Sequence, residues 1–332
     1  MSSILQENYI PLVLCAGFGT RLKPLTNYMP KVVCPLIDKP FAFYNIEKFF
    51  KAGFKTVHCN VHYLPEIVKL ELISACEFFG YDSSRIRFWH EENILETGGG
   101  VTRIFKELCQ ENSVNEKKDL IIVSGDIVAD FPLQEMLARW ETKDSNELAL
   151  MCTKNMKQFR KDATYVSEDL TEVLGFGEIF ANENSAKKSA AKVFTNHQIV
   201  SGSVVGKCEI EKKSSIDSFY RTIINSGKKI INFNYSESLY WFNIGSAQEY
   251  LECIQFFIQE KKQEQVNYAF FMPDNLKHII KIYLNNKRKI QAQIGSGKVI
   301  IAFKQSKDLG EYISLNEVFE ITDAEDIIYL YV

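Results

Sequence analysis

Short apolar runs alternate with longer amphipathic stretches through the first half of the chain. The apolar runs have the length of buried strands, and they cover residues 12–15, 56–61, 86–89, 120–123 and 148–152. Between them, apolar side chains recur with helical spacing at residues 43–52, 64–79, 99–109 and 133–141. Strands that alternate with helices are joined by crossovers, which make the strands parallel. The pattern predicts an α/β fold with a mostly parallel sheet flanked by helices.

The alternation weakens beyond residue 155. We expect strands at 199–205 and 230–235, helices at 214–225 and 247–259, and an exposed loop or short helix at 182–192. A charged linker at 260–264 predicts two domains, residues 1–257 and a small C-terminal α/β or β region of residues 258–332. In that region, a helix is expected near 275–285 and β-like runs at 299–303, 312–315 and 327–332.

A glycine-rich loop follows the first apolar run. Gly17 and Gly19 are followed at once by Thr20 and Arg21, and Lys31 comes after Pro30. Glycines let backbone N–H groups surround phosphate oxygens, and fixed cations neutralise the charge of a polyphosphate. The loop is neither the dinucleotide fingerprint nor a P-loop, because the glycine and Gly-Lys spacings of those motifs are absent.

Two more segments are expected beside this loop. Asp126 follows the buried run 120–123, and the glycine-rich segment 97–99 follows the run 86–89. Ligands of open α/β sheets bind outside the carboxyl ends of the strands, so the three segments should share one edge. A carboxylate there is well placed to hold Mg²⁺ against a phosphate.

Bulk composition excludes several classes of protein. The chain has 332 residues, 46% apolar and 24% charged, and its net charge of −3 offers no basic field for nucleic acid. The N-terminus does not read as a signal peptide, and no apolar stretch is long enough to span a membrane. Eight cysteines without a C-x-x-C pair fit free thiols in a reducing cytosol, so a cytoplasmic location is expected.

Residues 14–40 resemble the signature of the sugar-1-phosphate nucleotidyltransferases. The family pattern is L-x-A-G-x-G-T-R-L-x-P-L-T, followed by Pro-Lys, Pro and Lys-Pro, and every element of it is present here. The resemblance extends over about residues 9–257 and implies a Rossmann-like, GT-A-like catalytic domain. It implies transfer of a nucleotidyl group from an NTP to a sugar 1-phosphate, with release of pyrophosphate.

The resemblance also assigns roles to residues. Arg21 and Lys31 would be catalytic, acting on the departing phosphates and on the α-phosphate. Mg²⁺ would be bound by Asp126 and by Asn243, which stands where many members have aspartate. The nucleotide would contact Leu14, Ala16, Gly17, Gly19, Thr20, Thr97, Gly98 and Gly99.

The sugar phosphate would contact Glu178, Ser201 and Gly202. The Lys-Pro pair that usually follows this glutamate is missing, and Lys187, Lys188 and Lys192 are unaligned candidates for a lysine on the sugar phosphate.

The segment 95–100 is similar to that of N-acetylmuramate-1-phosphate uridylyltransferases, so UTP is the expected donor. Two alternatives remain open: a phosphocholine cytidylyltransferase on the same scaffold, and a catalytically weak, nucleotide-binding regulatory paralogue. A homo-oligomer is also left open. No nucleic acid or membrane partner is expected.

Overall fold

The computed structural model describes the chain apart from residues 1–4, 6, 24, 28, 37–38, 112–116, 157–162, 178, 181–188, 247–248, 251, 254–255, 258–267, 274–297, 305–325 and 332. The chain forms two compact units. The first unit comprises Met1–Gly17, Asn45–Pro65 and Asp82–Trp241, and the second comprises Phe18–Tyr44, Glu66–Tyr81 and Phe242–Val332. The predicted boundary between residues 257 and 258 stays a prediction.

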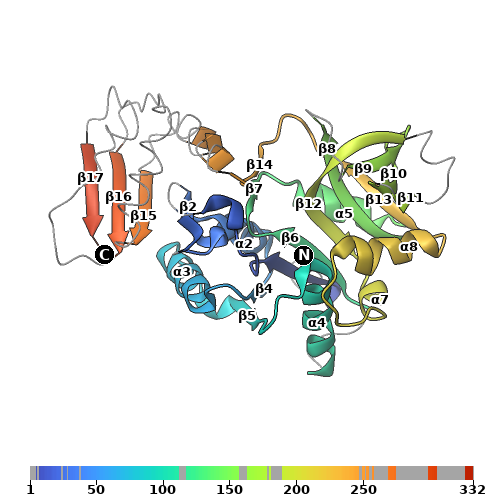
Figure 1. The fold of residues 1–332 in the computed structure, drawn as a ribbon, viewed down its shortest axis with the longest axis horizontal. Coiled ribbons are helices and arrows are strands. Elements are labelled where there is room, and N and C mark those ends of the chain that lie inside the picture. The colour runs from blue at the N-terminus through green and yellow to red at the C-terminus, as the bar shows by residue number, and fades with distance from the viewer. Residues whose placement is uncertain are drawn as a thin grey trace. The chain divides into compact units, whose positions relative to one another are not determined.

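A mixed sheet forms the centre of the first unit (Figure 1). Its order is β11-β10-β13-β8-β12-β6-β1-β4-β5, with β9 pairing β10 and β12. The parallel half consists of β1 (Tyr9–Leu14), β4 (Val57–Val61), β5 (Ile86–His90) and β6 (Asp119–Ser124). The other half consists of β8 (Glu147–Asn155), β9 (Thr164–Ser167), β10 (Glu172–Phe176), β11 (Ile179–Phe180), β12 (Ser189–Val200) and β13 (Lys229–Asn234).

Strand β12 makes the sheet mixed. It lies antiparallel to both β6 and β8, whereas β8 and β13 are parallel to each other. A strand was expected at 199–205, but β12 begins at Ser189 and ends at Val200, and α7 (Gly202–Val205) follows it. Its register shifts between Phe194 and Gln198, where Asn196 has a φ of 61°. Such a β-bulge re-aims side chains locally.

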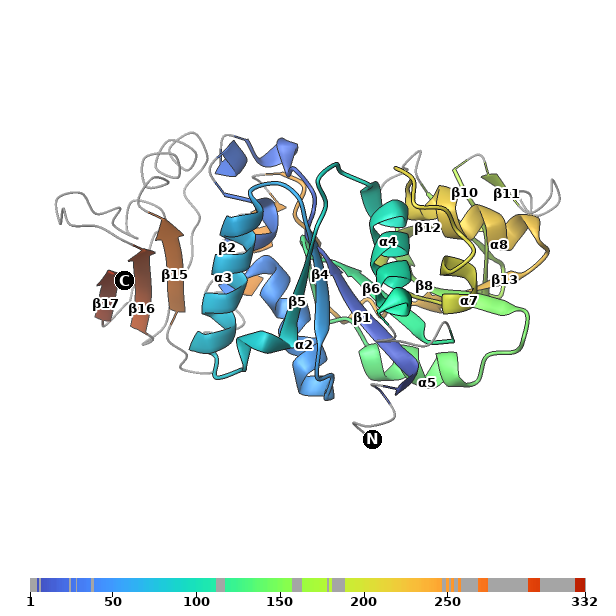
Figure 2. The ribbon, with the colours of Figure 1, turned by 90° about the horizontal axis from the view of Figure 1, so that it is seen from below.

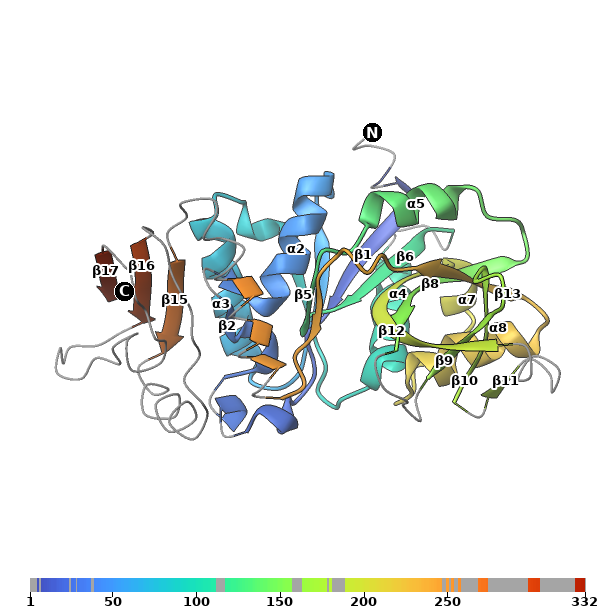
Figure 3. The same cartoon turned by 90° about the horizontal axis from the view of Figure 1, so that it is seen from above.

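Helices cover both faces of this sheet (Figures 2 and 3). Helices α4 (Glu96–Gln110), α7 and α8 (Arg221–Asn225) and the π-helical turn η5 (Ile216–Tyr220) cover one face, and α5 (Leu133–Glu141) covers the other. Helix α4 buries Val101, Ile104, Phe105 and Leu108, the spacing of a single helical face.

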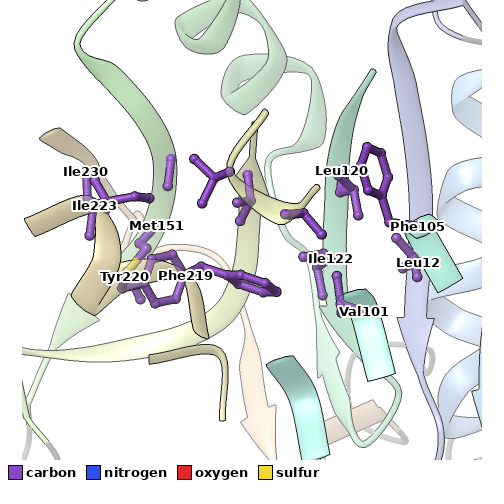
Figure 4. Packing of buried hydrophobic residues seen from close by; sticks show 14 of the residues in the cluster. Leu12, Val101, Phe105, Leu120, Ile122, Met151, Phe219, Tyr220, Ile223 and Ile230 are labelled. Carbon is purple, nitrogen blue, oxygen red and sulfur yellow. The ribbon is translucent and has the colours of Figure 1, made fainter. Parts of the chain in front are cut away.

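The core under α4 is continuous across the sheet (Figure 4). It combines strand residues such as Leu12, Leu120 and Met151 with Phe105 of α4 and Phe219 of η5. Losing one such aromatic side chain costs about 3–5 kcal/mol of stability. This packing holds the strand ends in a fixed register.

The second unit carries the glycine loop from Phe18 onward. It contains the 3₁₀ turns η1 (Thr20–Leu22), η2 (Leu25–Asn27) and η3 (Lys31–Val33), the antiparallel pair β2 (Pro35–Leu36) and β3 (Lys39–Pro40), and nearly all of α3 (Pro65–Phe78). Helix α2 (Phe41–Ala52) begins in this unit, and Phe43 on it stacks on Phe79 with ring centroids 5.5 Å apart.

The C-terminal part of the second unit contains a three-stranded parallel sheet. Its strands are β15 (Tyr268–Pro273), β16 (Lys298–Lys304) and β17 (Asp326–Tyr331). The runs predicted at 299–303 and 327–332 lie in or largely within β16 and β17, whereas β15 was not predicted. The predicted elements at 275–285 and 312–315 lie outside the described residues. In the described part of the chain, no helix has the length and apolarity to cross a bilayer.

Candidate functional site

The parallel strands of the first unit end at one edge of the sheet, as predicted. Leu14 is in register with Asn60 on β4 and with Ser124 on β6, and Asn60 is in register with Trp89 on β5. The segments that follow these strand ends include Ala16, Gly17, Glu91 and Asp126. Ala16 and Gly17, expected to contact the nucleotide, and Asp126, expected to bind the metal, therefore follow strands that end at this edge.

A buried chain of hydrogen bonds crosses this edge. The backbone N of Cys15 donates to Oδ1 of Asn60 (2.8 Å), and Nδ2 of Asn60 donates to Oε1 of Glu91 (2.8 Å). The other oxygen of Glu91, Oε2, accepts from the backbone N of Leu95 (2.9 Å). Asn60 is 3% exposed and Glu91 2% exposed. Two side chains thus tie the start of the glycine loop to the segment that precedes α4.

The glycines at 98–100 lie in the first turns of α4 and not in a loop. The backbone N–H groups of Gly98 and Gly99 are engaged, because both donate to the carbonyl of Lys213 (2.9 and 3.2 Å). A Cβ at Gly99 would lie 1.9 Å from the carbonyl oxygen of Glu211. Close packing against residues 211–218 therefore accounts for Gly98 and Gly99, and packing against the Glu91 carboxylate accounts for Gly100. The contact of these glycines with a nucleotide stays a prediction. The hydroxyl of Thr97 accepts from the backbone N of Ser215 (2.8 Å).

The residue before these glycines has an unusual backbone. Glu96, the first residue of α4, has a φ of 58° and an exposed side chain. A non-glycine residue at such a φ carries backbone strain, and strain of this kind is concentrated at functional sites.

Hydrogen bonds fix the turn that carries Asp126. The hydroxyl of Ser124 donates to Oδ1 of Asp126 (2.6 Å), and the backbone N of Gly125 donates to the carbonyl of Leu14 (2.9 Å). Nδ2 of Asn45 donates to the carbonyls of Ser124 (3.0 Å) and Ile127 (2.9 Å). The carboxylate is half-buried at the carboxyl end of β6, where the sequence placed it.

The second unit brings the signature loop and the buried lysine together. Gly19 has a φ of 62°, and a Cβ there would lie 2.7 Å from Cβ of Lys31. The hydroxyl of Thr26 donates to the carbonyl of Gly19 (2.9 Å), which fixes the turn. Lys31 is only 5% exposed, whereas Thr20, which follows Gly19 in the loop, is exposed.

Arg21 lies next to the segment that contains Asn243. A Cβ at Gly245 would lie 2.8 Å from Nη1 of Arg21, so the lack of a side chain there lets the guanidinium approach. The backbone N of Gly245 donates to Oε2 of Glu249 (2.8 Å) and to the carbonyl of Asn243 (2.9 Å). Gly19, Arg21, Lys31 and the 243–245 segment therefore form one local cluster of the second unit.

The residues assigned to Mg²⁺ have suitable chemistry. Asp126 offers a carboxylate and Asn243 an amide carbonyl, both hard oxygen donors of the kind Mg²⁺ prefers. Among the described residues, no group of three or more His, Cys, Asp or Glu side chains could hold a metal ion. Asp126 belongs to the first unit and Asn243 to the second, so their joint binding of one ion stays a prediction. Few protein oxygens are needed, because Mg²⁺ usually keeps several waters and binds substrate phosphates.

Two predicted sugar-phosphate residues, Ser201 and Gly202, do not lie at this edge. Val200 of β12 is in register with Leu120, near the start of β6, and His197 is in register with Val123, near its end. Ser201 and Gly202 lie beyond Val200, and the backbone N of Gly202 donates to Asp119 at the first position of β6 (3.3 Å). They therefore lie at the edge opposite Asp126, because β12 runs antiparallel. Glu178, Lys187 and Lys188 lie outside the described residues.

Several residues at the edge were missed by the sequence interpretation. Asn45, Asn60 and Glu91 belong to no motif, and their only sequence signal is a polar residue on an otherwise apolar element or just beyond it. Lys192 was one of three unaligned candidates, and the structure places it on β12, close to Asn155 and Asn234 at the ends of two neighbouring strands.

Comparison with known proteins agrees with these features. The nucleotidyl transferase family matches residues 10–260. The mannose-1-phosphate guanylyltransferase catalytic subunit beta of Xenopus tropicalis is 23% identical over 275 residues, which cover 81% of this chain and 70% of that protein. A mannose-1-phosphate guanyltransferase of Gibberella zeae is 31% identical over 143 residues, 43% of this chain and 37% of that protein.

Solved structures show the same fold. HddC from Yersinia pseudotuberculosis complexed with GMP-PN has a TM-score of 0.56 at 17% identity, with 75% of this chain and 99% of that chain covered. A UDP-glucose pyrophosphorylase complexed with UDP-glucose has a TM-score of 0.58 at 15% identity, with 76% and 99% covered. The predicted α/β fold is confirmed. Because the family match spans most of the chain, the protein belongs to the nucleotidyl transferase family.

Proposed function

We propose that this chain catalyses Mg²⁺-dependent attack of a sugar 1-phosphate on the α-phosphorus of an NTP, with pyrophosphate as the leaving group. The attacking phosphate oxygen is already ionised, so the reaction needs no general base. Catalysis then consists of positioning and charge stabilisation. The observation that carries the proposal is the packing of Gly19 against the buried Lys31, with exposed Thr20 beside it, in the glycine loop.

Each group has a defined task in this proposal. Arg21 binds the departing phosphates, and Lys31 stabilises the charge that develops at the α-phosphate. Asp126 and Asn243 supply oxygens to Mg²⁺, which when bound neutralises phosphate charge. Asn60 and Glu91 keep the backbone at Cys15 and Leu95 in place.

The identity of the donor rests on two different lines of support. Residues 95–100 resemble those of uridylyltransferases, which favours UTP. The mannose-1-phosphate guanylyltransferases that resemble this chain use a guanylyl donor by their names, which favours GTP with mannose 1-phosphate as the acceptor. A site that pairs with one base edge rejects the others, since each unpaired buried polar group costs about 1–3 kcal/mol.

One assay tests the whole proposal. Pyrophosphate release is measured with UTP, GTP, CTP, ATP and dTTP, each combined with mannose 1-phosphate, glucose 1-phosphate, N-acetylmuramate 1-phosphate or phosphocholine. Turnover with a sugar 1-phosphate is expected, and it should disappear when EDTA replaces Mg²⁺. Turnover with CTP and phosphocholine alone would support the cytidylyltransferase instead.

Nucleotide binding without turnover would point to a regulatory paralogue. Thermal shifts with each NTP and Mg²⁺ report binding separately from chemistry. If no nucleotide raises the melting temperature of the protein, the proposed function is refuted.

A further inference from the structure

A buried amide on α2 bridges the two ends of the turn that carries Asp126. Nδ2 of Asn45 donates to the carbonyl of Ser124 (3.0 Å) and to that of Ile127 (2.9 Å). Ser124 is the last residue of β6, and Ile127 is the first residue of β7 (Ile127–Ala129). One NH₂ group therefore uses both of its hydrogens to hold the strands on either side of a short turn.

The amide of Asn45 is costly in its surroundings. Asn45 is 1% exposed, and Phe41 and Phe49, one helical turn before and after it, are buried aromatic residues. In the part of the chain that the structure describes, its Oδ1 is buried without a hydrogen-bond partner. A leucine would fill this apolar position without burying an unpaired acceptor. Packing therefore does not explain the asparagine, whereas the two carbonyls that it holds do.

The orientation of this amide follows from its partners. Both groups that face Nδ2 are backbone carbonyls, which can only accept. If the amide were turned round, Oδ1 would point at two other oxygens. The NH₂ group of Asn45 therefore faces the turn, and the chain retains it there although the oxygen on the other side is unpaired.

Ser124 fixes the carboxylate of Asp126 itself. Its hydroxyl donates to Oδ1 of Asp126 at 2.6 Å, the length of a charge-assisted hydrogen bond. The backbone N of Gly125 donates to the carbonyl of Leu14 (2.9 Å), which ties the turn to the end of β1. Asn45 thus holds the backbone at both ends of the turn, and Ser124 sets the direction of the carboxylate.

Such fixation matters for a Mg²⁺ ligand. Mg²⁺ demands near-ideal octahedral geometry, so a displaced carboxylate binds it less tightly. A ligand that is already ordered also avoids the cost of becoming ordered when the ion binds. Side chains that orient a metal ligand contribute about 10- to 100-fold to metal affinity or activity.

We propose that Asn45 and Ser124 are positioning residues that hold Asp126 in the geometry that binds Mg²⁺ together with the nucleotide phosphates. The inference rests on the proposed function, because it takes Asp126 as a metal ligand. Asn45 acts through the backbone of the turn, and Ser124 acts through the carboxylate.

Helix α2 offers a control on the same strand. Lys48, one turn beyond Asn45, donates to Oδ1 of Asp130 (2.6 Å), which directly follows β7. The two side chains are 28% and 50% exposed, so this ion pair contributes little stability. Lys48→Met therefore changes the same helix and the far end of β7 while leaving the hydrogen bonds of the turn in place.

A second control reproduces the loss of a buried amide. Asn232 on β13 is 6% exposed, and its Nδ2 donates to the carbonyl of Leu170 (2.8 Å). Strands β8 and β12 separate β13 from β6 in the sheet. Asn232→Leu should lower the melting temperature as a buried asparagine loss does, without changing the turn at Asp126.

The first measurement needs neither metal nor substrate. Hydrogen exchange of the metal-free protein is followed in the peptide that covers residues 125–127. Asn45→Leu should speed exchange there about 10-fold, the scale of one or two lost hydrogen bonds, because the turn opens more often. Exchange in this peptide should stay at the wild-type rate in Lys48→Met and Asn232→Leu.

The second measurement is a Mg²⁺ titration of the thermal shift at a saturating concentration of the NTP that stabilises wild type most. Asn45→Leu and Ser124→Ala should each raise the half-maximal Mg²⁺ concentration about 10-fold. In the pyrophosphate-release assay, excess Mg²⁺ should restore most of the kcat, and the KM for the sugar 1-phosphate should stay unchanged. Both controls should need the wild-type Mg²⁺ concentration.

A wild-type Mg²⁺ requirement in Asn45→Leu would overturn the proposal, even if exchange in the turn is faster. An equal rise in Asn232→Leu would also overturn it, because the effect would then be general destabilisation. If Asn45→Leu does not fold, Ser124→Ala, which removes one hydroxyl at a strand end, decides by the same criterion. If no NTP with Mg²⁺ shifts the melting temperature of wild type, the proposed function itself fails, so the two failures are distinguishable.

Discussion

In the hydrogen-bond chain through Asn60 and Glu91, each group has a fixed role as donor or acceptor, and a single substitution disrupts this order. Asn60 accepts from Cys15 N and donates to Glu91, and Glu91 accepts again from Leu95 N. Glu91→Gln keeps the shape but replaces one acceptor with a donor. If the new NH₂ group faces Asn60, two donors meet, and if it faces Leu95, the backbone N–H is unpaired. Turning the amide of Asn60 only moves the unpaired donor to Cys15.

The cost follows from burial of the whole chain. Both side chains are nearly inaccessible, so one unpaired donor costs about 1–3 kcal/mol. Loss of the carboxylate before α4 adds about 0.3–1 kcal/mol, because an anion near a helix N-terminus is favourable. With a total near 2 kcal/mol and a urea m-value of about 3 kcal/mol/M, the unfolding midpoint should fall by about 0.7 M.

A double substitution should restore the pattern. In Asn60→Asp with Glu91→Gln, the new carboxylate accepts from Cys15 N and from the new amide, whose oxygen accepts from Leu95 N. Asn60→Asp alone places two carboxylates together and should be destabilising. The double-mutant cycle should therefore give a coupling energy of about 1–3 kcal/mol that favours the pair.

The assay is urea unfolding of the full chain, followed by thermal shift with NTP and Mg²⁺. Glu92→Gln is the matched control, since the neighbouring side chain is exposed. The double variant should recover nucleotide-induced stabilisation as well as stability. Wild-type stability of Glu91→Gln, or simple additivity in the cycle, would show that the hydrogen-bond direction is irrelevant and refute the reasoning.

Three other predictions concern the phosphates, the metal and acid stability. Lys31→Ala should lower kcat by about 10²–10³ with the fold intact, and wild-type turnover would make this lysine structural. Asp126→Ala should abolish Mg²⁺-dependent activity. Asn243→Asp should keep the activity and raise the affinity for Mg²⁺ in a titration, and loss of activity in this variant would show that the amide of Asn243 has another role. Burial, chiefly, lowers the pKa of His58 and of His197 from 6.5 to about 3, so both fold as neutral groups. The stability that depends on these neutral histidines is fully present above pH 6.5 and is lost as the pH falls toward 3. At pH 5 the free energy of unfolding should be lower by about 2 kcal/mol for each histidine, and equal urea midpoints at pH 7 and pH 5 would contradict this expectation.

The local pattern of apolar residues was sufficient to predict the main strands and helices in the first half of the chain. Apolar runs such as 120–123 and the helical stripe of Val101, Phe105 and Leu108 gave the strands and helices that the structure shows. The chemical motifs were equally local, because a glycine loop, its cations and a carboxylate after a strand depend on neighbouring residues. For that reason the sequence predicted Gly19, Lys31 and Asp126 as site residues. The structure places Asp126 at the strand edge and Gly19 against Lys31, and their roles stay predictions.

The direction and neighbours of β12 were decided only by tertiary structure. On β12, the residues before Gln198 run toward the edge that carries Asp126, so Lys192 is close to that edge. Ser201 and Gly202 follow the strand and lie at the opposite edge. Nothing in a single strand's pattern tells which way it runs beside a partner, since side chains alternate identically in both directions. The same holds for Gly98–Gly100 and for the pair Asn60 and Glu91, whose partners are distant in sequence. Sequence determined most elements of the first half and the glycine-loop motif, and long-range pairing determined which polar residues share the edge.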